Sequence, residues 1–171
     1  IDNTERENYL FNSKINGIEE ADLILLIGTN PRFEATMVNA RIRKAFLSNN
    51  TKIISLNDVG DLTYPYEILD GKTLTIKEIA ENKNNVSKNI IDSKKPMIIL
   101  GESFFNTKSS SYLFYTLKKF LDKNNKFTDQ WNSLNILSTN AATVGNFDLD
   151  IINQVEDLIK DLNENKFELI Y

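Results

Sequence analysis

Short apolar runs alternate with amphipathic stretches along the chain, a pattern typical of a parallel sheet with crossover helices. Each run is apolar on both faces, as expected for a strand that helices cover on both sides. Five strands are predicted on this basis, at Asp22–Gly28, Lys52–Leu56, Met97–Gly101, Leu134–Ser138 and Phe167–Tyr171.

Helical periodicity lies between these runs. A helix over Pro31–Leu47 would begin with Asn30 as N-cap, and its inward stripe would be Ala35, Val38, Ile42, Ala45 and Phe46. A second helix is predicted over Ser109–Lys123, with Leu113, Leu117, Phe120 and Leu121 facing inward. A third would follow Asp148 as its cap, with a stripe of Ile151, Val155, Leu158, Ile159 and Leu162. The resulting order, βαβαβαβαβ with right-handed crossovers, predicts a doubly wound α/β fold.

Length and composition limit the kinds of site and partner that this chain can have. A chain of 171 residues can bury about 70% of its unfolded surface in a single core, and we expect one domain over residues 1–171. The absence of cysteine and histidine excludes a zinc site, an iron–sulfur cluster or a His-based triad built from this chain alone. A net charge of −4 and scattered lysines argue against nucleic acid as a partner. Because no apolar run approaches roughly 20 residues, we expect no direct membrane insertion.

The turn after the first strand, Gly28-Thr29-Asn30-Pro31, occupies the position where doubly wound sheets bind ligands. It matches a dinucleotide fingerprint poorly, since Asn30 and Phe33 replace the second and third glycines and Pro31 lacks an N–H donor. A capped βα turn without a ligand is therefore preferred to a phosphate-binding loop.

Two further motifs fail on inspection. Gly71-Lys72-Thr73 resembles the end of a Walker A loop, but Tyr66 stands where the upstream glycine is required. Asp148 and Asp150, near Asn146 and Asn153, lack the glycine and the final carboxylate of a calcium loop. We predict a surface turn for the first motif and a helix cap for the second. The sequence thus offers no catalytic, cofactor-binding or metal-binding residue.

Arginine is concentrated in the stretch after the first strand. The chain has 16 Lys and 4 Arg, yet Arg32, Arg41 and Arg43 fall within it, close to Glu34. Because arginine suits desolvated ion pairs better than lysine, these residues indicate an interface or buried ion pairs. A plain solvated surface stays open as the alternative.

Several of these segments together resemble a known family, the large iron–sulfur subunits of respiratory complex I, which comprise the 75 kDa subunit of the mitochondrial enzyme and its bacterial counterpart. The resemblance covers nearly the whole chain and rests on Asn8–Ser13, Gly17–Asp22, Gly28–Ala35, Asn39–Lys44, Asp61–Tyr64, Lys94–Gly101 and Trp131–Leu137.

The resemblance implies a role. In that family the N-terminal part carries the clusters, and the C-terminal part resembles molybdopterin oxidoreductases but is taken to have lost the pterin in the mitochondrial lineage. This chain would be a segment of that second part: a Rossmann-like structural domain of the peripheral arm, supporting electron transfer from NADH to ubiquinone coupled to proton translocation, with no cofactor of its own. Its partners would be the cluster-bearing part and other peripheral-arm subunits, on the matrix side of the mitochondrial inner membrane or the cytoplasmic face of a bacterial one.

Two rival functions remain. One is a fragment of a working pterin oxidoreductase, although no metal-ligating residue is identifiable for it. The other is a nucleotide-binding module, because Lys94–Gly101 also looks like the start of the central domain of thiamine-diphosphate enzymes. Whether the chain is itself catalytic is left open.

Overall fold

The computed structural model describes residues 4–149, 159–160 and 162–164. These fall into two units, residues 1–139 and 140–171, which are described separately. The second unit contains α7 (Thr143–Asp148) and a helical stretch at residues 159–160 and 162–163. The first unit holds the sheet. The single domain over residues 1–171 stays a prediction.

A five-stranded parallel sheet forms the centre of the first unit, in the order β3-β2-β1-β4-β7. The strands are β1 (Leu23–Ile27), β2 (Lys52–Ser55), β3 (Glu67–Ile68), β4 (Pro96–Gly101) and β7 (Leu134–Leu137). The doubly wound α/β fold is thereby confirmed. The predicted strands at residues 22–28, 52–56, 97–101 and 134–138 are all present, and the one at 167–171 lies outside the described residues.

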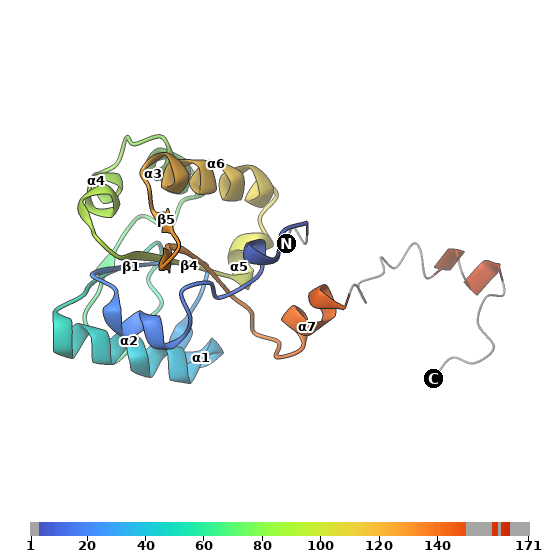
Figure 1. Ribbon diagram of the computed structural model, residues 1–171, viewed down its shortest axis with the longest axis horizontal. Coiled ribbons are helices and arrows are strands. Elements are labelled where there is room, and N and C mark those ends of the chain that lie inside the picture. Colours follow the sequence, from blue (N-terminus) through green and yellow to red (C-terminus); the bar gives the residue numbers. More distant parts are fainter. Residues whose placement is uncertain (1–3, 150–158, 161, 165–171) are drawn as a thin grey trace. The chain divides into compact units, whose positions relative to one another are not determined.

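Helices cover both faces of this sheet (Figure 1). One face packs against α1 (Pro31–Glu34) and α2 (Thr36–Asn49), and the other against α3 (Thr73–Ala80), α4 (Asn85–Asp92), α5 (Glu102–Phe105) and α6 (Ser110–Lys123). Alternation along each strand divides the side chains between two cores, so that Ile24 and Leu26 of β1 face α2 while Leu25 faces α6. The expected stripes of α2 and α6 are confirmed as inward-facing.

Short elements complete the unit. They are η1 (Arg6–Asn8), η2 (Asn16–Glu20) and an antiparallel hairpin of β5 (Phe127–Thr128) with β6 (Trp131–Asn132). The backbone N–H of Ile136 donates to Leu10 at 2.9 Å and Phe11 bridges Asn135, so the N-terminal segment covers the β7 edge of the sheet.

The predicted helix over Pro31–Leu47 is divided in two. Ala35 has φ −152° and ψ 75°, a non-helical conformation that ends α1 before α2 begins. The reason lies in tertiary contacts, since the side chains of Asn30 and Arg32 bond to the loop after β2 and hold α1 there. Neither glycine nor proline marks the break in the sequence.

Helix α4 begins within an Asn- and Lys-rich stretch for which the sequence pattern predicts no element. Asn84 caps α4 by accepting a hydrogen bond from the N–H of Val86 at 2.9 Å, and Val86 and Ile90 are buried. The only apolar residues of α4 are Val86, Ile90 and Ile91, and the other five are polar. A short helix in an Asn- and Lys-rich stretch therefore escapes detection by periodicity.

Candidate functional site at the carboxyl edge of the sheet

The switch point of the sheet lies between β1 and β4. These neighbouring strands run parallel, and the chain leaves β1 towards the α2 face but leaves β4 towards the α6 face. Ligands of doubly wound sheets bind in the crevice at such a point, outside the carboxyl ends of the strands. The turn Gly28-Thr29-Asn30-Pro31 is located there, as the sequence predicts.

Two glycines allow two backbone segments to approach each other closely at this point. Gly28 has φ +65°, and a Cβ atom there would lie 2.5 Å from the backbone nitrogen of Phe104. A Cβ on Gly101 would lie 2.3 Å from the carbonyl oxygen of Gly28. The backbone after β1 is therefore in direct contact with the start of α5, which follows β4.

The backbone N–H groups in the first turn of α1 form hydrogen bonds within the turn itself. Asn30 accepts three backbone N–H bonds, from Arg32 on its side-chain Oδ1 at 3.2 Å and from Phe33 and Glu34 on its carbonyl at 3.1 and 2.9 Å. The side-chain amide of Asn30 donates to the carbonyl of Val59 at 2.8 Å. Since Pro31 has no N–H, this helix end has little left to offer an anion.

Charged groups at the edge are paired within the chain. Arg32 donates to the carbonyl of Asp61 at 2.6 Å and forms an ion pair with its carboxylate at 2.5 Å. The backbone N–H of Thr63 and the guanidinium of Arg32 hold the pKa of Asp61 below its usual value. The side chain of Arg32 thus connects α1 to the loop after β2.

Two glutamates also lie at this edge. The hydroxyl of the buried Thr29 donates to Glu34 at 2.6 Å. Glu102 accepts hydrogen bonds from the N–H of Thr139 at 2.9 Å and from the hydroxyl of Ser138 at 3.2 Å. Hydrogen bonds from Thr139 and Ser138 lower the pKa of Glu102. Two carboxylates therefore lie at the edge near β1 and β4.

The other two arginines of the motif lie on α2. Arg41 pairs with Glu19 of η2, which Lys44 also approaches at 2.6 Å. Hydrogen bonds and charge from Lys44 and Arg41 lower the pKa of Glu19. Arg43 is exposed, and its positive charge contributes to the lowered pKa of Asp61. The side chains of Arg32 and Arg41 are 39% and 36% exposed, so their ion pairs lie at the surface and are not buried.

A buried network that the sequence did not reveal holds the same region together. The side-chain amide of Asn39 donates to the carbonyl of Leu62 at 3.0 Å, and its oxygen accepts a hydrogen bond from the hydroxyl of Tyr64 at 2.7 Å. Burial raises the pKa of Tyr64. This network fastens the loop after β2 to α2 and so places Asp61 beside Arg32. Its only signal in the sequence is that both partners fall within stretches of the family resemblance.

The two incomplete motifs of the sequence lie next to the ends of helices. Gly71 lies in the turn before α3, and Lys72 pairs with Asp70 at 3.6 Å. Asp148 is the last residue of α7, whereas Asp150, Asn153 and most of the helix predicted after them lie outside the described residues. Within residues 4–149, 159–160 and 162–164, no group of acidic side chains could hold a metal ion.

Strand order and a switch point between β1 and β4 define a Rossmann-like α/β domain. The chain belongs to the molybdopterin oxidoreductase family, whose model matches residues 1–171. The resemblance to the complex I large subunit is also confirmed by curated relatives. The NADH dehydrogenase [ubiquinone] iron-sulfur protein 1 of Solanum tuberosum is 36% identical over 155 residues, which cover 91% of this chain and 21% of that protein.

Two further relatives agree with it. The NADH-ubiquinone oxidoreductase 75 kDa subunit of Reclinomonas americana is 39% identical over 85% of this chain and 21% of its own length. The 78 kDa mitochondrial subunit of Neurospora crassa is 39% identical over 84% of this chain and 19% of its own length. The chain thus spans about a fifth of the curated relatives that it matches.

Proposed function

We propose that this chain is a structural domain of the large subunit of complex I, which supports electron transfer from NADH to ubiquinone, coupled to proton translocation, without a cofactor of its own. The observation that carries the proposal is the closed switch point, where the backbone of Phe104 packs against Gly28. Similarity to the 75 and 78 kDa subunits supports the assignment to complex I.

The family name implies a pterin cofactor, and the residues at the switch point do not fit one. Phe104 lies so close to Gly28 that even a Cβ atom would not fit there, and this turn is the one at which such folds bring the backbone near a phosphate group. The first N–H groups of α1 are already bonded to Asn30, and the nearby side chains Glu34 and Glu102 are acidic. Acidic groups repel a phosphate, so this edge would disfavour the cofactor on charge as well as on space.

The iron–sulfur clusters would be bound elsewhere. One relative is named as an iron-sulfur protein, but this chain contains no cysteine to ligate a cluster. We assign the clusters to the rest of the large subunit or to partner subunits, and the partners of this domain to the peripheral arm of the complex. Relatives named as mitochondrial support a place on the matrix side of the inner membrane. Among the helices that the structure describes, none is long and apolar enough to cross a membrane.

The test is a native gel of gently solubilised membranes, stained for NADH oxidation and followed by mass spectrometry of the active band. We expect peptides of this chain at one copy alongside cluster-bearing subunits, and no stoichiometric molybdenum in the purified complex. Migration of the chain as a small species would refute the assignment to complex I. Stoichiometric molybdenum bound to the chain would refute the absence of a cofactor.

A further inference from the structure

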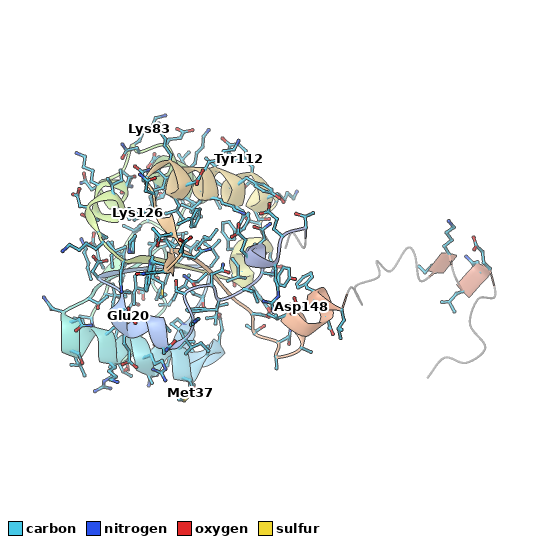
Figure 2. All side chains as sticks on the ribbon, viewed as in Figure 1. Glu20, Met37, Lys83, Tyr112, Lys126 and Asp148 are labelled. Carbon is cyan, nitrogen blue, oxygen red and sulfur yellow. The ribbon has the colours of Figure 1, made fainter. Side chains whose placement is uncertain are left out.

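The outer face of α2 is apolar and exposed. Met37, Ala40 and Leu47 recur at spacings of three and seven residues, which places them on one side of the helix, and Met37 and Leu47 are each 69% exposed. Phe33 of α1, which is 80% exposed, lies three residues before the start of this helix. Figure 1 shows α1 and α2 end to end below the sheet, and Figure 2 shows Met37 on their side away from it.

The charge of α2 is one-sided. Its 14 residues include Arg41, Arg43 and Lys44 but neither Asp nor Glu, although the whole chain has a net charge of −4. Glu19 pairs with Arg41 and Lys44. Among the described residues, Arg43 forms no ion pair, although its charge acts on the carboxylate of Asp61. Arg43 is exposed and lies about one helical turn from both Leu47 and Ala40, so its guanidinium borders the apolar residues.

We propose that this outer face, made of Phe33, Met37, Ala40, Arg43 and Leu47, docks onto the remainder of the complex I large subunit. The inference rests on the proposed function. The docking partner would present an apolar ridge bordered by carboxylates, because Arg43 needs an anionic partner when the apolar side chains are covered. Arginine, methionine and aromatic residues are the types enriched at the centres of protein interfaces.

The rest of the large subunit is preferred over a second copy of the chain. A symmetric contact through α2 would place the Arg43 side chains of both copies in one interface, and like charges oppose such an interface. The matched relatives are about five times longer than this chain, which covers 21% of the S. tuberosum protein. Polypeptide joined to or held beside this domain meets the α2 face at high effective concentration.

Photocrosslinking in the assembled complex identifies the occupant directly. A benzoylphenylalanine at Leu47 should crosslink to a peptide of the large subunit from outside the region matched by this chain, with Asp or Glu near the crosslinked residue. The same group at Leu74, which is 57% exposed on α3, serves as the control on the opposite face and should not give that product. Crosslinks from position 47 to a second copy, to another subunit or to lipid would refute the proposal, as would no crosslink at all.

Substitutions test the chemistry of the face. Arg43→Glu should lower the fraction of the chain that co-migrates with the NADH-oxidising complex by about tenfold, as expected for an interfacial arginine. Leu47→Glu should have a similar effect. The matched controls are Lys88→Glu on α4 and Leu74→Glu on α3, both at exposed positions, and they should leave co-migration unchanged.

The outcomes separate the two proposals. Full co-migration of Arg43→Glu and Leu47→Glu would refute the docking face while leaving the role in complex I intact. Failure of the unmodified chain to co-migrate would refute the role itself. Melting temperatures of all four variants should match that of the unmodified chain, because none of the replaced side chains is in the core. An equal loss of co-migration in the two controls would also refute the docking face.

Discussion

At the scale of single residues, glycines determine how closely β1 and β4 approach at their carboxyl ends. Gly28 combines a positive φ with a close contact to Phe104, while Gly101 contacts the carbonyl of Gly28. Gly60 also has a positive φ, of +77°, but has no atom within 4 Å of its Cβ position. Substitutions at Gly28 and Gly60 can therefore separate the cost of backbone strain from the cost of a steric clash.

Gly28→Ala should destabilise the chain by about 3 kcal/mol, because the new methyl group meets backbone that cannot move aside and the left-handed conformation is strained. Gly60→Ala should cost about 1 kcal/mol, from conformation alone. Urea unfolding at constant m-value measures both. Equal losses for the two variants would show that the contact with Phe104 contributes nothing to stability.

Tyr64 should make stability depend on alkaline pH. Burial raises its pKa in the folded state above the ordinary value of 10.0, so the unfolded chain loses this proton first as pH rises. The associated stability is fully present below about pH 10 and is lost above it, at about 1.4 kcal/mol per pH unit until the folded-state pKa is reached.

Tyr64→Phe should cost about 1–2 kcal/mol at pH 8, because the side-chain oxygen of the buried Asn39 loses its donor. At pH 11 the difference from the unmodified chain should be smaller by about 1 kcal/mol, since the variant lacks the titrating hydroxyl. Urea unfolding at the two pH values checks this. Tyr112→Phe, at a side chain that is 55% exposed, is the control and should change little at pH 8. A difference that stays constant between the two pH values would contradict the argument.

At the scale of elements, periodicity predicted the long and strongly amphipathic segments and missed the short ones. Both faces of β1 and β4 are apolar and buried, so their sequence alone marks them as central strands. In contrast, β3 has two exposed residues and, in the described part of the chain, pairs only with β2, while β5 and β6 are two residues each. Such elements are defined by the neighbours to which they bond, which no local pattern records.

Helix caps provide a prediction at this scale. Asn84→Ala should destabilise the chain by about 1 kcal/mol, because the N–H of Val86 loses its acceptor at the start of α4. Asn85→Ala, at the next and exposed position, is the matched control and should be close to neutral. Thermal unfolding of both variants measures the difference. Equal melting temperatures would show that α4 does not depend on its cap.

At the scale of the whole molecule, the order β3-β2-β1-β4-β7 fixes the place where a ligand would bind in this fold class. Contacts between the chain segments at this point then determine whether a ligand has room to bind. The sequence motif at Gly28–Pro31 is compatible with either a binding loop or a capped turn. The approach of α5 to Gly28 favours the capped turn.

The closed edge predicts that nucleotides do not bind. ADP, FAD or NADH at millimolar concentration should leave the melting temperature of the chain unchanged, since ligand binding to the folded state would raise it by mass action. Sodium chloride at matched ionic strength controls for charge effects. A saturable rise with any of the three ligands would support the alternative function, a nucleotide-binding module.

The sequence by itself determined the α/β class, four of the strands, the buried faces of α2 and α6, and the family. These features depend on local periodicity and on motif identity, which survive without knowledge of distant contacts. Tertiary structure alone decided the break at Ala35, the pairing of Arg32 with Asp61 and the bond between Tyr64 and Asn39. Each of these depends on segments that are separated in sequence and brought together by the parallel sheet.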